Sequence, residues 1–222
     1  DAPVTDASSE ALEDGGDDAG DLDAGDAAPA SDGAPEVLTF DVGRSWQSPN
    51  GALWKTSDAG TAITGAPAHL HPVILARPPL PSDDFTVHAV VRAQTRHEWG
   101  VVTRAQESGE AVVFGSEFGG SPTPFLGTIT HDTWNIEKLA DGEAYAAPTI
   151  PTRYHVEVRA AGRLITARLW IEGAARPGDW QAATTAPWAT GRGVGFYTYG
   201  VFSETLLEDL RVSQPATLFA AL

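Results

Sequence analysis

The sequence predicts an all-β protein, an antiparallel β-sandwich of two sheets preceded by a disordered acidic tether. Apolar and polar residues alternate in short runs from Leu38 onward, and Gly, Pro, Asp and Asn separate these runs. No long stretch repeats with the 3.6-residue period of an amphipathic helix. Many short strands without intervening helices are typical of a sandwich. We expect one such domain over residues 37–214, followed by a C-terminal tail over residues 215–222.

The tether is predicted from the composition of residues 1–36. This segment contains twelve Asp and Glu residues but no Lys, Arg or aromatic residue. Such a segment buries too little apolar surface to offset the entropy of ordering it, so we expect it to be extended and disordered. It carries most of the net charge of −16, because the other residues contain eighteen acidic and fourteen basic side chains. The folded part therefore has a net charge of about −4.

Composition also limits the function. The sequence has no basic cluster, which argues against a nucleic-acid partner, and no apolar run of membrane-spanning length. The absence of cysteine excludes disulfides, thiolate metal sites and a cysteine nucleophile. The chain begins at Asp1, which fits a processed precursor. We expect an exported protein, at a bacterial cell surface, in the periplasm or secreted. The tether resembles the segments that follow the lipidated cysteine of bacterial surface lipoproteins, which is compatible with a lipid anchor upstream of it.

The strands are predicted in order along the chain. The run "DFTVHAVVRA" places Phe85, Val87, Ala89 and Val91 on one face, which indicates a half-buried strand. Shorter strands follow in "EWGVVTRAQ", "AVVFGSEF" and "PFLGTIT", and Asp141-Gly142 predicts a hairpin turn. In "RYHVEVRAAGRLITARLWIEG", Gly162 turns the chain between two strands whose core-facing residues are Tyr154, Val156, Val158, Ile165, Ala167, Leu169 and Ile171.

The segment "GVGFYTYGVFSETLLEDLRV", residues 193–212, predicts two further strands. In the first of them Val194, Phe196 and Thr198 share the core face. Tyr197 and Tyr199 are therefore expected to project from the opposite face.

The order of these segments resembles that of the concanavalin A-like lectin/glucanase jelly rolls, over residues 38–213. The nearest branches are the laminin-G-like modules and the domains related to 3-keto-disaccharide hydrolases. Leu207, Glu208, Asp209 and Leu210 occupy the places of the family's closing-strand pattern. The resemblance implies that "GVGFYTYG" is the penultimate strand and that the closing strand returns beside the N-terminal part of the domain.

The resemblance also implies a sugar-binding face on the side of the sheet opposite the core. Tyr197 and Tyr199 suit this role, because sugar C–H faces stack on aromatic rings and sugar hydroxyls bond to their polar tips. Alternatively, both tyrosines are exposed without binding a ligand, since tyrosine is common in strands. Arg104, in "GVVTR", matches an arginine that many relatives carry and offers a planar fork for vicinal hydroxyls or a carboxylate. Its alternative is an ion pair with Glu117.

Trp99 precedes Arg104 at the expected rim of its strand and is a candidate stacking platform, as is Trp134. Trp170, Trp180 and Trp188 are further platform candidates, although most tryptophans are expected to pack in the core.

Catalysis is not predicted. Glycoside hydrolysis generally needs two paired carboxylates, and the Glu-x-Asp-x-x-Glu pattern of the fold's endoglucanases is absent. We expect a carbohydrate-binding, lectin-like module that contacts a glycan or a glycosylated surface without chemistry. The alternatives are a glycoside hydrolase or polysaccharide lyase with a degenerate motif, and an adhesion or structural module that binds protein.

Two groups of residues in the sequence are candidate metal ligands. His69 and His71, in "PAHLHPV", have the spacing of zinc ligands, but no third ligand accompanies them. The resemblance implies a structural calcium ion between the N- and C-terminal strands, with Asp209 and Asp41 as ligands. The alternative for Asp209 is a solvent-facing acid.

Overall fold

The computed structural model describes residues 36–39, 46–57, 60–65, 71–117, 123–130, 134–145, 149–199 and 205–215. The contact pattern divides the chain into Asp1–Asp32 and Gly33–Leu222, and every described residue lies in the second unit. The regular elements among these residues are all strands, which confirms the predicted all-β class. This part of the chain also holds no helix with the length and hydropathy that a membrane crossing requires.

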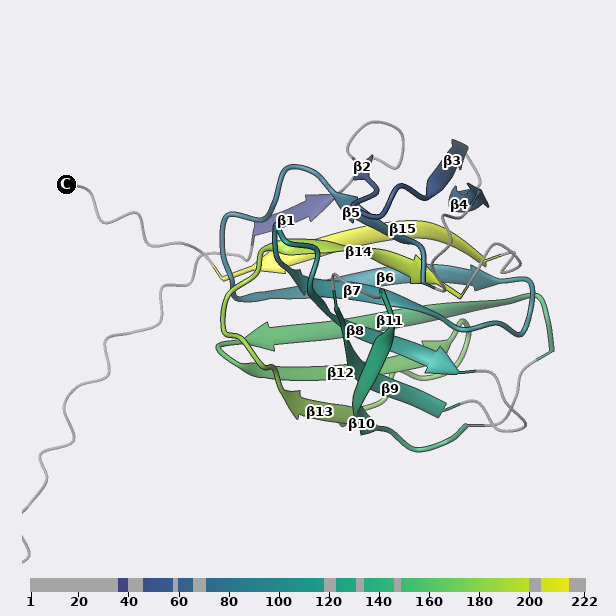
Figure 1. The fold of residues 1–222 in the computed structure, drawn as a ribbon. Coiled ribbons are helices and arrows are strands. Elements are labelled where there is room, and N and C mark those ends of the chain that lie inside the picture. The colour runs from purple at the N-terminus through teal and green to yellow at the C-terminus, as the bar shows by residue number, and fades with distance from the viewer. Residues whose placement is uncertain are drawn as a thin grey trace, which may run out of the picture. The chain divides into compact units, whose positions relative to one another are not determined.

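The described strands form two antiparallel sheets, which we call sheet A and sheet B (Figure 1). Sheet A has the spatial order β13 (Ala182–Thr185), β12 (Leu164–Ile171), β11 (Thr152–Ala161), β6 (Phe85–Ala93), β15 (Thr205–Gln214), β4 (Gly60–Gly65) and β3 (Leu53–Ser57), with β1 (Glu36–Thr39) also paired to β15. Sheet B has the order β10 (Ile136–Asp141), β9 (Thr123–Ile129), β8 (Ala111–Glu117), β7 (Trp99–Ala105), β14 (Gly193–Thr198), β5 (Val73–Ala76) and β2 (Trp46–Gln47).

The alternation in sheet A produces the predicted faces. In β6 every second residue from Phe85 to Ala93 is buried, and the residues between them are partly exposed. The pairings Val87↔Val158 and Ala89↔Val156 bring the apolar sides of β6 and β11 to the same face. Gly162 turns the chain between β11 and β12 as expected, with a φ of 54°.

The closing strand β15 is central to sheet A. One edge of β15 pairs with β6, and the other pairs with β4 at Leu207↔Thr61 and with β1 at Glu36↔Gln214. The prediction that the closing strand returns beside the N-terminal part of the domain is therefore confirmed.

The hairpin predicted at Asp141-Gly142 is wrong. Asp141 ends β10, which pairs with β9, and the next strand along the chain is β11 in the other sheet. The Gly142 N–H donates to the Pro124 carbonyl at 2.7 Å, so the dipeptide continues beside β9 before the chain crosses over. The dipeptide Asp-Gly indicates a turn, but it does not indicate with which sheet the next strand pairs.

The main core lies between the sheets and contains large aromatic side chains. Trp99 of sheet B contacts Tyr154 of sheet A, with ring centroids 5.2 Å apart. Trp54 and Phe196 meet edge-to-face at 6.3 Å, and the hydroxyls of Ser116 and Tyr145 lie 2.6 Å apart. Burial raises the pKa of both Tyr145 and Tyr154 above the usual value. These contacts join the two sheets. The alternation of apolar residues predicts that each side chain faces the core, but it does not predict which side chain of the other sheet it contacts.

A deletion of residues 1–39 should lower the free energy of unfolding by about 2–4 kcal/mol, because β1 loses its backbone hydrogen bonds to β15 and Leu38 leaves the core. A deletion of residues 1–32 removes only the compositionally distinct segment and serves as the control. Urea denaturation followed by tryptophan fluorescence measures both. Equal stability of the two truncated proteins would contradict the role of β1.

Candidate functional site

In strand β14 the residues alternate between the two faces as predicted, but the outer face is buried instead of open to solvent. Val194 and Phe196 lie in the core between the sheets, and Tyr197 points to the outer face of sheet B. Tyr197 is nevertheless 0% exposed, within a second apolar cluster that includes Val73 and Phe125. Tyr197 thus lies on the face opposite the main core, as predicted, but it is not open to a ligand, because this face of the sheet is itself covered. Tyr199 remains 42% exposed.

Two glycines explain how Tyr197 is accommodated. A Cβ atom at Gly100 would lie 2.4 Å from Tyr197 Cε1, and one at Gly115 would lie 2.0 Å from the tyrosine oxygen. The ring therefore rests directly on the backbones of β7 and β8. Its hydroxyl donates to Glu98 Oε1 at 3.2 Å. Burial raises the pKa of Tyr197 well above its usual value, and the charges of Glu98 and Glu117 raise it further.

His71 and Trp134 cover this part of sheet B. His71 Nδ1 lies 3.0 Å from the Trp134 carbonyl, and Nε2 lies 3.4 Å from Glu98 Oε1. Because a carbonyl oxygen only accepts, Nδ1 carries the proton of that bond. The imidazole ring also contacts the rings of Tyr197 and Tyr199, at centroid distances of 5.9 and 5.5 Å. Trp134 is consequently 4% exposed, a covering residue rather than an open stacking platform.

Arg104 does not lie on the outer face with Val102, as the alternation predicts. Its φ is 53°, and the register of β7 with β14 is irregular opposite it. This local backbone turns the guanidinium toward sheet A, where it donates to the carbonyls of Ala189 and Gly162 and lies 3.5 Å from Asp84. Arg104 is 0% exposed. Burial lowers its pKa, and the charge of Asp84 opposes that effect.

The remaining predicted ligand contacts are dispersed. Trp99 is buried in the main core instead of lying at a rim. Glu117 pairs with Lys138 at 2.7 Å instead of with Arg104, and this hydrogen bond raises the pKa of Lys138. Of the residues predicted for the sugar face, Tyr199 and Glu117 keep exposed side chains, whereas Arg104 and Trp99 do not lie on that face.

The calcium prediction rests on Asp209 and Asp41. Asp41 lies outside the described residues. Asp209 Oδ2 forms an ion pair with Arg211 Nε at 2.8 Å and so already pairs with a cation. The described residues contain no cluster of three or more His, Asp or Glu side chains placed to hold a metal ion. Asp209 therefore does not fit a calcium site built from these neighbours. His69, the other half of the predicted zinc pair, also lies outside the described residues.

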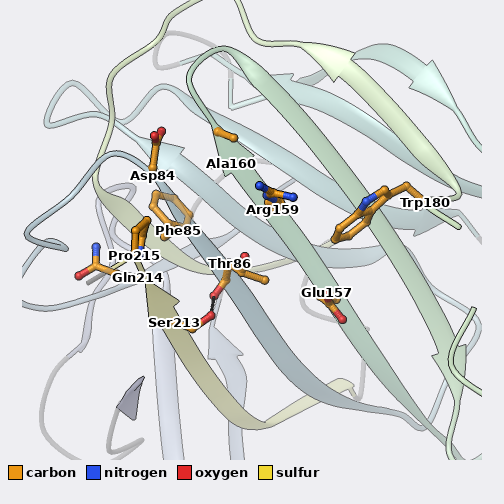
Figure 2. Close-up of a pocket in the computed structure, with 11 residues that line it drawn as sticks. Asp84, Phe85, Thr86, Glu157, Arg159, Ala160, Trp180, Ser213, Gln214 and Pro215 are labelled. Carbon is orange, nitrogen blue, oxygen red and sulfur yellow. Dashed lines mark hydrogen bonds between the residues drawn. The ribbon is translucent and has the colours of Figure 1, made fainter. Parts of the chain in front are cut away.

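A pocket of about 380 Å³ lies on the outer face of sheet A (Figure 2). We call it the sheet A pocket. It is formed where β15, β6 and β11 run side by side and where the chain approaches β13. Its lining residues are Asp84, Phe85, Thr86, Glu157, Arg159, Ala160, Ala161, Trp180, Ser213, Gln214 and Pro215.

One wall of the sheet A pocket is Trp180. The guanidinium carbon of Arg168 lies 4.3 Å from the centroid of the indole ring, within the range of a cation–π contact. Arg168 Nη1 donates to the carbonyls of Pro177 at 2.8 Å and Gly178 at 3.1 Å, in the connection that leads to Trp180. These contacts hold both the ring and the segment that carries it.

Glu157 fixes Arg168 in turn. Its carboxylate receives hydrogen bonds from Arg168 Nη2 at 2.9 Å and from Arg176 Nη2 at 2.7 Å. The side chains of Glu157 and Arg168 are only 11% and 8% exposed. Burial raises the pKa of Glu157, but the hydrogen bonds and charges of the two arginines outweigh it, so the pKa lies below the usual value.

The floor of the pocket is polar and set by register. Ser213 pairs with Thr86 on the neighbouring strand, and Thr86 pairs with Arg159 on the next. Figure 2 shows Arg159 among the lining residues, with Trp180 on one side and Gln214 and Pro215 on the other. Arg159 is exposed and has no ion pair or hydrogen bond with any other described residue. The floor therefore presents a positive group that no other described residue neutralises.

An aromatic cluster continues this face of sheet A beyond the pocket. The rings of His155 and Trp170 stack at 5.2 Å with an angle of 13°, and His88 lies 5.6 Å from His155. Burial lowers the pKa of His88, and the neighbouring His155 lowers it further. The stacked imidazole occupies one face of Trp170, as the Arg168 guanidinium occupies one face of Trp180.

Sequence reasoning named Trp180 but missed Glu157 and Arg159. The signal was present, because the alternation in "YHVEVRA" places both on the side opposite the core. Their grouping with Ser213 depends on β6 lying between β11 and β15, which brings together residues more than fifty positions apart. His71 and Glu98 were not grouped with Tyr197 for the same reason.

No model of a known protein family matches this sequence, and a search of curated proteins finds no match. Solved structures do show similarity. The carbohydrate-binding module CBM66 from Bacillus subtilis aligns at 11% identity with a TM-score of 0.52, over 77% of this chain and 92% of that one. The exoplasmic/lumenal domain of VIP36, in its Ca²⁺- and Man3GlcNAc-bound form, aligns at 14% identity with a TM-score of 0.52, over 80% and 88%.

A legume lectin-like domain from Entamoeba histolytica is also similar, at 9% identity and a TM-score of 0.54, over 79% of this chain and 95% of that one. At these identities the likeness concerns the fold. The chain therefore has the concanavalin A-like lectin/glucanase jelly-roll fold that its sequence predicts.

The substitution Arg104→Lys should lower the free energy of unfolding by about 2–4 kcal/mol, because one ammonium group cannot serve both carbonyls and Asp84. Arg211→Lys, at an exposed pair with Asp209, is the matched control and should cost less than about 1 kcal/mol. Chemical denaturation measures the free energy of unfolding of both variants. Equal losses of stability would show that the planar guanidinium of Arg104 is not required.

Glu157→Gln should cost about 3–5 kcal/mol, because it leaves the buried Arg168 without its anion. The pH profile gives a second check. The pKa of Glu157 is lower in the folded state, so its stabilisation is complete above its usual value of 4.5 and is lost as pH falls through the folded pKa. Thermal unfolding between pH 7 and 3 should show a smaller loss below pH 4.5 for Glu157→Gln than for the unmodified chain. Parallel profiles would contradict this assignment.

Proposed function

We propose that this chain is a carbohydrate-binding module whose ligand occupies the sheet A pocket. The observation that carries the proposal is an indole ring, Trp180, held beside a polar floor that includes Arg159, which has no partner among the described residues. Sugars offer an apolar C–H face for an aromatic ring and hydroxyls for polar groups, and this pocket provides both. Its volume of about 380 Å³ also falls within the range of small-molecule sites.

The order already present in the pocket supports binding. Arg168 and Glu157 hold Trp180 through the ion pair and the cation–π contact described above. A wall that is fixed before the ligand arrives loses less conformational entropy on binding than a mobile one does. Two of the similar structures are named for carbohydrate binding or as a lectin-like domain, which supports the ligand class.

The wider setting of the module is also a proposal. The acidic composition of residues 1–36 supports a tether that presents the domain away from an anchoring point, on an exported protein at a bacterial surface. The absence of a paired-carboxylate motif in the sequence supports binding without catalysis.

A second candidate is a hydrolase or lyase that acts at the outer face of sheet B. It is favoured by the grouping of His71, Glu98 and Tyr197, with Glu98 Oε1 lying 3.4 Å from the imidazole and 3.2 Å from the phenol oxygen. Burial of His71 and Tyr197 counts against it, because a substrate would first have to displace the cover over these groups. Release of reducing ends from polysaccharides by the purified chain would support this candidate.

Trp180→Ala should weaken binding of the glycans that the chain recognises on an array by about 1–2 kcal/mol, the value of a lost aromatic contact. Tyr199→Ala, on the other sheet, is the control and should bind as the unmodified chain does. Isothermal titration with the best array ligand measures both, and circular dichroism checks folding.

The reverse pattern, with binding lost in Tyr199→Ala and retained in Trp180→Ala, would place the ligand on sheet B and reject the sheet A pocket. Absence of any glycan ligand on the array would reject carbohydrate binding altogether.

A further inference from the structure

We infer that the sheet A pocket selects an anionic sugar, with Arg159 binding a carboxylate of the ligand while Trp180 stacks on the sugar ring. This inference rests on the proposed function and names the class of carbohydrate. The charges, hydrogen-bond donors and hydrogen-bond acceptors of the described pocket residues support it.

The two acidic groups of the pocket pair with arginines other than Arg159. The Glu157 carboxylate is held by Arg168 and Arg176, with both of its oxygens engaged. Asp84 Oδ1 accepts the Gly162 N–H at 2.8 Å and lies 3.5 Å from Arg104. The Glu157 carboxylate is therefore fully paired, and Asp84 lies toward Arg104 and the Gly162 N–H.

The unsatisfied groups are mainly donors. Arg159 offers its guanidinium N–H groups, and no other described residue bonds to them. The Thr86 hydroxyl is also without a hydrogen bond among these residues. In contrast, the Gln214 amide donates to the Ser82 carbonyl at 3.4 Å, and the Ser213 hydroxyl donates to the Thr86 carbonyl at 3.5 Å. A pocket with an excess of donors is complemented by a ligand rich in acceptors.

Several arginines gather around the pocket of a chain that is acidic overall. Arg104, Arg159, Arg168 and Arg176 lie in or directly behind the lining, against the carboxylates of Asp84 and Glu157. The chain as a whole carries a net charge of −16 and repels polyanions. Arg159, which lines the pocket and pairs with no other described residue, is therefore the group that would attract an acidic glycan.

A carboxylate suits Arg159 better than a neutral hydroxyl does. Two carboxylate oxygens match the planar guanidinium fork, and charge-assisted hydrogen bonds are about twice as strong as neutral ones. A uronic acid carries its carboxylate directly on the sugar ring. Its ring can stack on Trp180 while its carboxylate reaches Arg159, because both side chains line the same pocket.

The experiment uses the full chain and titrates it with a galacturonic acid tetramer, the methyl ester of that tetramer, and a neutral galactose tetramer. A sulfated galactose tetramer tests the other common source of negative charge. Arg159→Gln and Arg159→Lys are compared with Arg211→Gln, a matched control that removes the same charge from the same sheet face outside the pocket lining. Circular dichroism and thermal unfolding confirm that each variant is folded.

The acidic tetramer is expected to bind roughly tenfold to a hundredfold more tightly than its methyl ester, and Arg159→Gln should remove that difference. Arg159→Lys should retain only part of it, and Arg211→Gln should retain all of it. Added NaCl should weaken the acidic ligand more than the ester.

Three outcomes would overturn the inference. Equal binding of acid and ester, with both lost in Trp180→Ala, would keep the carbohydrate site and reject its preference for an anion. Tighter binding of the sulfated tetramer than of the galacturonate tetramer would keep the anion and reject the carboxylate. Failure of these ligands and of a broad glycan array would reject the proposed function itself, and the inference with it.

Discussion

The buried guanidinium of Arg104 joins the two sheets, and the surroundings of the sheet A pocket depend on it. It starts from β7 in sheet B and bonds to Gly162 at the β11–β12 turn, to Ala189 before β14, and to Asp84 before β6. A buried charge is tolerated only when it is paired and hydrogen-bonded, so these partners must keep their positions. Asp84 begins the lining of the pocket. The carbonyl of Arg104 in turn accepts the Trp188 indole N–H at 3.1 Å.

The outer faces of the two sheets have different roles. On sheet B, Tyr197 packs onto two glycines, and His71 and Trp134 complete the cover of a second apolar cluster. On sheet A, neighbouring strands present charged, hydroxyl and aromatic side chains in register, and they interact across the strands. Sheet A therefore presents polar and aromatic groups around a pocket, whereas the centre of the outer face of sheet B is a covered apolar cluster. The jelly-roll fold alone does not dictate this choice, because either face of a sandwich can carry a site.

Three arginines show why the site could be predicted only in part. Arg104, Arg159 and Arg168 all lie in strands predicted from the alternation, and all have the same chemistry. In the folded chain one is buried against backbone carbonyls, one pairs with Glu157, and one has no partner among the described residues. The residue type indicates binding of an anion or a carbonyl. The partner of each arginine depends on the tertiary structure. Arg104 bonds to carbonyls more than fifty positions away, and Arg168 pairs with Glu157 on the neighbouring strand.

The sequence by itself determined the all-β class, the faces of β6, β11 and β12, the phase of β14 and the closing position of β15. The position of β15 was implied by the family resemblance, and the other features follow from a period of two residues, which is local and survives in the chain without tertiary contacts. Only the tertiary structure decided that the chain changes sheets after Asp141, that the left-handed φ of Arg104 turns it away from Val102, and that Tyr197 is covered. It also decided that Trp180, Arg159 and Ser213 share a pocket. The physical reason is that pairing between distant strands brings these residues together, and no local pattern records which strands pair.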